Sequence, residues 1–418
     1  ESERTSAGVI GAPIRRKAWR QTFSSLANRD FRNLWLGMLL MMGAMQMLML
    51  TQSYLIYDMT GSPGLLGLVN SSFALPLLVL ALIAGATADR LEGKRIIQIG
   101  QSFATLSALA VAVSVATGTH TWVHLLVSSM VLGACMSFLM PARQAIIPQL
   151  VGEGNLTNAM ALNAAGMSAT TLMAPALAGG LYAAWGPAAT YFVISGFFLG
   201  SVLLTGVLPK LTKVARRTRS TMTGDIGAGL SYVRRTPLVL VLLFMGLATA
   251  LFAMPFRLLM PIFIVDIYNR GPEAMGLMVS GMGLGSLAGA LFIASLGTWR
   301  RGMMLIAGTF VTGIALLLVA LLPFYTVALG IMVLLGVGDA GRRTLNQALI
   351  IEVTDAQFRG RVMSMFMMNF ALMPLGALPA GLAAEFLGGQ VVVGILAGLL
   401  LTTAVVVLST QKRLRDVK

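Results

Sequence analysis

Twelve long apolar runs dominate this chain and constrain its fold more than any other feature. Each run has roughly 20 or more residues, which is the length an α-helix needs to cross a bilayer. Backbone groups in lipid must pair within their own element, and the runs are too long for barrel strands, so we expect helices. The runs lie at about 34–57, 63–88, 95–117, 121–147, 155–182, 187–208, 237–265, 273–297, 302–322, 325–350, 360–384 and 389–410.

The composition excludes the ordinary soluble classes. Apolar residues make up 57% of the chain and charged residues only 11%, whereas soluble domains average about 45–50% and about 25%. A soluble protein with this balance could not cover its surface with polar groups. We therefore predict an all-α polytopic membrane protein with twelve transmembrane helices in two six-helix bundles, and we expect a monomer surrounded by the lipid bilayer.

The distribution of basic residues predicts the orientation in the membrane. The chain has 30 Lys and Arg against 15 Asp and Glu, a net charge of +15, which by itself would suggest nucleic-acid binding. Nearly all these cations fall in the connections on one side of the spans, however, and Arg270 is the exception. Positive charge gathers on the cytoplasmic side of membrane proteins. We therefore expect no nucleic-acid partner, cytoplasmic termini, and a multi-pass protein of the plasma (inner) membrane.

The longest polar stretch follows six runs and precedes six more, as in transporters built from two repeated halves. Residues 144–147 (Gln-Ala-Ile-Ile) resemble residues 347–350 (Gln-Ala-Leu-Ile) about half a chain later. Within the polar stretch, Ile226, Leu230 and Val233 recur at helical spacing and predict an amphipathic helix on the membrane surface; a polar linker with some helix is the alternative. The predicted units are a tail (1–33), a first bundle (34–208), a linker (209–236), a second bundle (237–410) and a tail (411–418).

A charged motif joins the second and third runs. Gly85 allows close helix packing, and Asp89 at a helix end can accept hydrogen bonds from a facing helix. The basic residues that follow can pair with Asp89 or with acidic groups across the interface between halves. Such a group of charges can lock the two bundles in one orientation and release them in another, although a simple cytoplasmic turn is the alternative. The predicted switch residues are Gly85, Asp89, Arg90, Gly93, Lys94 and Arg95.

This motif resembles the signature loop of the major facilitator superfamily, Gly-x-x-x-Asp-Arg-x-Gly-Arg-Arg, with Glu92 as one extra residue. Other stretches resemble the branch with macrolide-type efflux proteins and the enterobactin exporter, namely residues 31–37, 57–62, 141–148, 260–263 and 359–364. The resemblance implies a secondary transporter that works by alternating access, most simply an exporter driven by the proton gradient, with no cofactor. One departure is notable: many members of the branch carry an acid after a glycine in the first span, and here Ala44 follows Gly43.

Charged residues inside the spans are the candidate functional groups, because a buried charge is costly unless it is paired or hydrated. Asp339 precedes Arg342 and Arg343 by three and four residues, so the three share a helix face and can pair. In a central cavity, Asp339 could titrate while an arginine holds it ionised or receives an anionic substrate; a structural ion pair or snorkelling is the alternative. Arg257 could face the same cavity and Asp266 the outer gate.

The resemblance also implies that spans one, four, seven and ten line the cavity, to which we assign Gln46, Gln52 and Asn346. Two histidines and one cysteine are too few for a metal site, so no metal is expected. An integral membrane enzyme is disfavoured because the spans hold no nucleophile–base set. We predict a multidrug-type antiporter for amphipathic small molecules, of drug or siderophore type. A lipid or lysolipid flippase on the same fold, or an importer, remains an alternative.

Overall fold

The computed structural model describes residues 24–80, 92–209, 230–296, 300–355, 357–372 and 374–415. Every regular element in these ranges is a helix, and ten of the helical segments are long and apolar enough to cross a membrane. The prediction of an all-helical polytopic membrane protein is therefore confirmed.

The first half of the chain begins with helices whose ends follow from local sequence. The Asn28 side chain accepts hydrogen bonds from the backbone N–H groups of Asp30 and Phe31 and so caps the first long helix. Gly61, with φ of 59°, ends that helix, and Ser62 caps the next one. The helices of this half are η1 (Ser24–Ala27), α2 (Arg29–Thr60), α3 (Pro63–Ser72), α5 (Gly93–Ala116) and α6 (Trp122–Gly206).

Helix α6 is 85 residues long and cannot be straight, because it would then extend about 130 Å. The Asn28 amide, at the start of α2, donates to the carbonyl of Leu150 in α6. Ser201, much later in α6, donates to the carbonyl of Gly37 in the same part of α2. Gly186 adopts a positive φ of 79°, which breaks the helical path. Between Leu150 and Ser201, α6 therefore leads away from the start of α2, turns, and comes back to it.

The second half is built in the same way from helices and short irregular turns. Prolines stand at the start of three of its α-helices, where the missing N–H costs nothing. Its elements are α8 (Pro237–Phe252), α9 (Met254–Ile262), η2 (Phe263–Ile267), α10 (Pro272–Leu296), α11 (Arg301–Leu321), α12 (Tyr325–Val353), α13 (Arg359–Leu372), η3 (Pro374–Gly376), α14 (Ala377–Leu387), α15 (Gly389–Thr410) and α16 (Lys412–Arg415).

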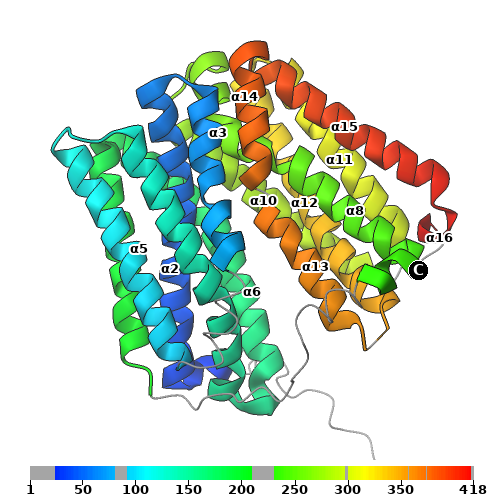
Figure 1. Cartoon of the computed structure of the whole chain (residues 1–418), viewed down its shortest axis with the longest axis horizontal. Coiled ribbons are helices and arrows are strands. Elements are labelled where there is room, and N and C mark those ends of the chain that lie inside the picture. The colour runs from blue at the N-terminus through cyan, green and yellow to red at the C-terminus, as the bar shows by residue number, and fades with distance from the viewer. Residues whose placement is uncertain are drawn as a thin grey trace, which may run out of the picture.

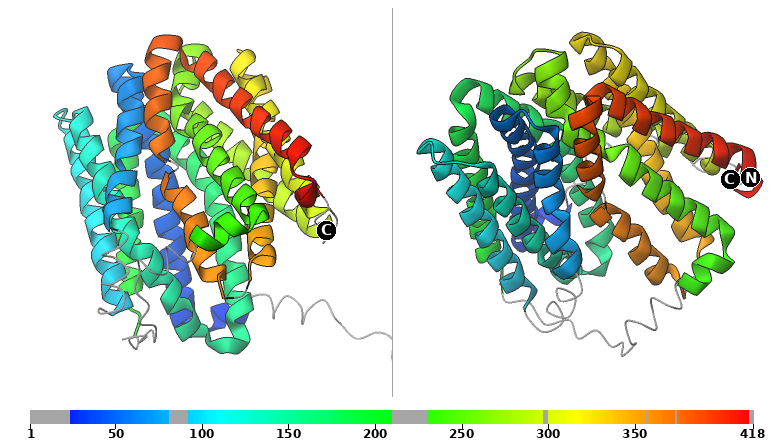
Figure 2. Two further views of the ribbon diagram at one scale, coloured as in Figure 1. Left: turned by 45° about the vertical axis from the view of Figure 1, so that its right-hand side comes forward. Right: turned by 45° about the horizontal axis from the view of Figure 1, so that its top comes forward.

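Among the described residues, the two halves pack closely together toward one end, which we call the closed end. Figures 1 and 2 show α2, α3, α5 and α6 grouped on one side and α8 to α16 on the other, with α3 beside α14 at the top. A Cβ atom on Gly67 of α3 would lie 2.6 Å from the carbonyl of Ala377 in α14. One on Gly276 of α10 would lie 2.6 Å from the carbonyl of Pro175 in α6. Only glycine permits this approach.

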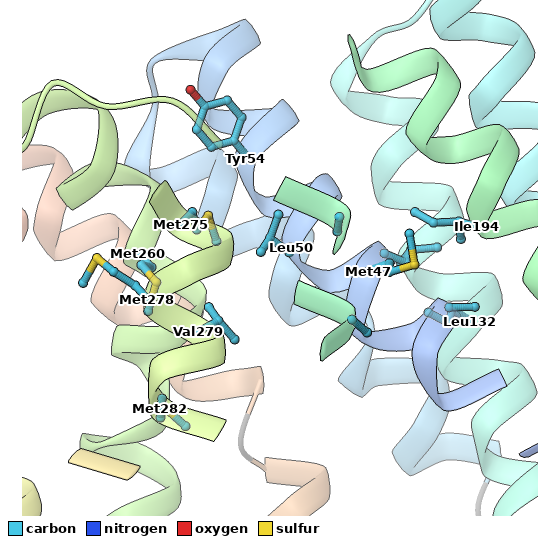
Figure 3. Close-up of a cluster of buried hydrophobic side chains, with 14 of the residues drawn as sticks. Met47, Leu50, Tyr54, Leu132, Ile194, Met260, Met275, Met278, Val279 and Met282 are labelled. Atoms are coloured by element: carbon cyan, nitrogen blue, oxygen red, sulfur yellow. The ribbon is translucent and has the colours of Figure 1, made fainter. Parts of the chain in front are cut away.

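The hydrophobic core continues from one half into the other through α2. Figure 3 shows Met275, Met278 and Met282 of α10 on one side of α2, and Leu132 and Ile194 of α6 on the other. Met47 and Leu50 of α2 lie between them and are buried. Flexible methionine side chains fill irregular gaps at this interface.

The central polar segment is described only from residue 230. Residues 230–235 are helical and lead into α8. Val233 is buried, and the Tyr232 ring stacks on Phe358 with 4.3 Å between ring centroids. The part of the predicted amphipathic helix that contains Ile226 lies outside the described residues.

Candidate functional site

An ion-pair cluster lies in the middle of α12, as the sequence spacing predicts. The Asp339 carboxylate accepts a hydrogen bond from Arg342 and pairs with Arg343 at 3.0 Å. Asp339 is 3% exposed and Arg342 5%, whereas the Arg343 side chain is 44% exposed. One arginine is thus fixed with the carboxylate in the interior, and the other can reach a ligand.

Arg257 joins the two halves near this cluster. Its guanidinium donates to the side-chain oxygen of Gln46, in α2 of the first half, at 3.1 Å. It also interacts electrostatically with Asp339 and Arg343. With Arg257, three guanidinium groups lie within electrostatic range of one carboxylate, and the cluster carries a net positive charge.

A pocket opens beside the exposed arginine. It is lined by Gly246, Thr249, Ala250, Met254, Arg342, Arg343, Asn346, Phe366 and Asn369. Asn346 is 1% exposed and its side-chain oxygen has no hydrogen-bond partner among the described residues. A Cβ atom on Gly246 would lie 2.8 Å from the Asn369 amide nitrogen and 3.1 Å from that of Asn346. The absence of a side chain at Gly246 leaves room for both amides at one wall of the pocket.

The candidates Gln46 and Gln52 do not lie together. Gln46 lines a small pocket with Arg257 between α2 and α10. Gln52 is buried within the first half and donates to the Ser129 hydroxyl at 2.6 Å. The two glutamines are six residues apart, and six residues rotate an α-helix by one full turn plus roughly 240°. Their side chains therefore point to different faces of α2.

Asp266 lies at the closed end, where it accepts a hydrogen bond from the Tyr57 hydroxyl of the first half. A second carboxylate makes a similar contact there. Glu385 of α14 accepts hydrogen bonds from the backbone N–H of Gly64 at 2.7 Å and from the Ser62 hydroxyl at 2.9 Å. Glu385 thus caps the N-terminus of α3 from the opposite half, where the positive helix dipole favours an anion.

The predicted switch motif is described only in part. Gly85, Asp89 and Arg90 lie outside the described residues. At its end, Gly93 begins α5, Arg95 pairs with Glu92 at 3.4 Å, and Lys94 donates to the carbonyls of Gly206 and Leu208. These contacts join elements of the first half, and the predicted pairing with Asp89 falls outside the described residues. Lysine suits the carbonyl end of a helix such as α6.

Comparisons with known proteins identify the family. A family model described as a transmembrane secretion effector of MFS type matches residues 20–418. The chain is a member of the major facilitator superfamily. The prediction of a transporter, and not of an enzyme, is confirmed.

Two curated relatives and one solved structure illustrate this membership. Macrolide efflux protein A of Streptococcus pyogenes is 26% identical over 373 residues, which cover 86% of this chain and 90% of that protein. The multidrug efflux pump Tap of Mycolicibacterium fortuitum is 28% identical over 348 residues, or 80% and 84% of the two chains. The crystal structure of a mutant nucleoside transporter NupG matches 92% of this chain and all of its own with a TM-score of 0.77 at 15% identity, which shows a shared fold.

Sequence reasoning missed three of the polar residues described above. Asn369 is an amide in the eleventh apolar run, which the choice of spans one, four, seven and ten left out. Tyr57 and Glu385 stand at helix ends, where polar residues are common, so neither gives a signal in the sequence. Their contacts appear only when the two halves are packed together.

Proposed function

We propose that the chain is a proton-driven exporter of amphipathic small molecules that works by alternating access. The observation that carries this proposal is the polar cluster joined to the first half through Arg257, in two halves whose described residues pack most closely at the closed end. A protein in this arrangement can expose the cluster to one side of the membrane while the closed end seals the other. The efflux activity named for the relatives supports the direction of transport.

We propose twelve crossings in two bundles, with domain boundaries at 34–208 and 237–410. One of the ten candidate spans, Asn158–Gly206, is 49 residues long and turns at Gly186, so it supplies two crossings. Helices α13 and α14 with η3 between them cover 359–387 apart from residue 373, and supply one more crossing as a broken helix. Broken helices are tolerated where they are buried in protein.

We propose that the closed end faces outward and the termini lie in the cytoplasm. Lys94, Arg301 and Arg359 stand at helix starts of the opposite end, whereas Arg270 lies at the closed end. The positive-inside rule then places the opposite end in the cytoplasm. In this orientation the structure is an inward-facing state, the one that would take up a substrate for export.

Transport in proteoliposomes tests the proposal. Vesicles that contain the full chain and a trapped pH-sensitive dye receive a panel of compounds that includes a macrolide and an aromatic carboxylate. We expect protons to move when a transported compound is added, and transport to fall when the pH gradient is collapsed. Substrate movement that is unaffected by collapsing the gradient would contradict proton coupling, and no movement of any compound by a folded protein would contradict the transporter.

A further inference from the structure

We infer that the pocket beside Arg343 binds an organic anion with an aromatic or aliphatic body, and that this anion is the class of substrate the protein carries. The inference rests on the proposed function and names the substrate class of the same site. It follows from the charge of the cluster, from its unpaired donors and from the mixed lining of the pocket.

The charge of the cluster is unbalanced. Among the described residues, Asp339 is the carboxylate that pairs with Arg342 and Arg343, and Arg257 also interacts with it electrostatically. Asp266 and Glu385, two acidic side chains of this half that contact the first half, stand near helix ends instead. A cationic ligand would add like charge in a region of low dielectric constant, where repulsion is strong. An anionic ligand would supply the missing counter-charge.

The donors of the cluster are also unbalanced. Arg342 is held by Asp339, yet its Nε has no hydrogen-bond partner among the described residues. Arg343 uses one terminal nitrogen for Asp339 and keeps nearly half of its side chain exposed. Guanidinium groups bind carboxylates through paired, directional hydrogen bonds. Two arginines that share one carboxylate therefore keep N–H donors that can bind the carboxylate of a ligand.

The amides complete the polar wall. The side-chain nitrogens of Asn346 and Asn369 approach the same face of Gly246 and can donate to an oxygen of the ligand. The side-chain oxygen of Asn346 lacks a partner although the residue is buried, so a hydroxyl or amide on the ligand can donate to it. A buried polar group without a partner is costly, and a ligand that pairs it recovers that cost.

The rest of the lining is apolar. Met254 and Phe366 stand in the same pocket as the arginines, and an aromatic face and a flexible thioether both suit a planar apolar body. The occupant that satisfies both parts is an amphipathic acid. Because an anion leaving a cell with a negative interior moves down the electrical gradient, its charge would also favour export.

A pair of isosteric probes tests the inference. The purified full chain in detergent is titrated with 2-naphthoate and with 2-naphthamide, which have the same aromatic body and differ in charge. We expect naphthoate to bind about tenfold more tightly than the amide. We expect Arg343→Gln to weaken naphthoate binding about tenfold and to leave naphthamide within about twofold, while Arg343→Lys retains part of the preference.

Arg301→Gln is the matched control, because Arg301 belongs to the same half and pairs with Glu352 outside the pocket. It should leave both affinities unchanged, and melting temperatures should show that every variant is folded. Equal binding of the two probes by the wild-type protein, or an equal loss for both in Arg343→Gln, would overturn the inference. Naphthoate binding that falls as much in Arg301→Gln would do so as well. Export of a cationic macrolide without any preference for naphthoate would support the proposal of an exporter and would overturn the inference that its substrate is an anion.

Discussion

The two halves of the molecule share a fold but treat polar groups differently. In the first half, the buried polar side chains of the described residues are neutral, and some bond to each other, as Gln52 does with Ser129 and Gln101 with Ser201, each at 2.6 Å. In the second half, the buried polar centre of α12 is ionic, with Asp339 held between two arginines.

Three contacts between the halves show the same division, although others, such as that of Asn70 with the carbonyl of Leu258, join two neutral groups. Arg257, Asp266 and Glu385 all belong to the second half, and each bonds to a neutral group of the first half, at Gln46, Tyr57 and Gly64 respectively. Binding of a proton or an ion changes the energy of a charged group far more than that of a neutral hydrogen bond. We therefore expect a ligand or a proton to act mainly on the charged groups of the second half, with the first half providing neutral partners.

The largest expected effect is at the ionic centre. Asp339→Asn removes the counter-charge from Arg342 and Arg343, and loss of one partner of a buried pair costs about 3–5 kcal/mol. We expect a large fall in melting temperature in detergent and loss of coupled transport. Asp339→Asn combined with Arg342→Gln should recover part of the stability, because the uncompensated buried charge is removed.

Glu352→Gln is the control for this prediction. It breaks the ion pair with Arg301, in which the Glu352 side chain is 51% exposed, and exposed pairs contribute only about 0–1 kcal/mol. Equal melting temperatures for Asp339→Asn and Glu352→Gln would show that the ionic centre is not a buried structural charge. Full coupled transport by Asp339→Asn would exclude Asp339 as the proton carrier.

An intermediate effect is expected where a charge of the second half meets a neutral group of the first. A double-mutant cycle between Glu385→Ala and Ser62→Ala, measured by thermal unfolding, should give a coupling of about 1 kcal/mol, as for residues in direct contact. The control cycle pairs Ser62→Ala with Asp58→Ala, because Asp58 is exposed at the same end of α2. No coupling in the first cycle, or the same coupling in both, would show that Glu385 does not hold the halves together.

The sequence predicts the ionic centre well and the contacts between halves poorly, for a physical reason. Asp339, Arg342 and Arg343 lie within one helical turn, so their pairing depends only on helix geometry. The pairing of Arg257 with Gln46, and that of Glu385 with Gly64, joins residues separated by 211 and 321 positions. These contacts depend on how closely the halves approach.

The same distinction explains the outcome at single residues. Close approach is set by glycine-to-backbone contacts such as Gly67 against Ala377, which no local pattern in the chain specifies. The spacing of Gln46 and Gln52, in contrast, can be read from the sequence. Helix geometry then predicts that only one of the two side chains can face the second half. The apolar runs likewise predict the helices, because length and hydropathy determine membrane insertion locally.

The smallest effect is expected at a neutral pair of the first half. Ser129→Ala removes the partner of Gln52, and hydrogen bonds between membrane helices contribute about 0.6 kcal/mol on average. The melting temperature should fall only slightly, with the anion preference and the proton coupling unchanged. Ser168→Ala, which removes a hydroxyl bonded only to the carbonyl of Ala164 within its own helix, should have still less effect. If Ser129→Ala instead abolished transport as Asp339→Asn is expected to do, the first half would be part of the switch, and the division between a neutral half and a charged half would fail.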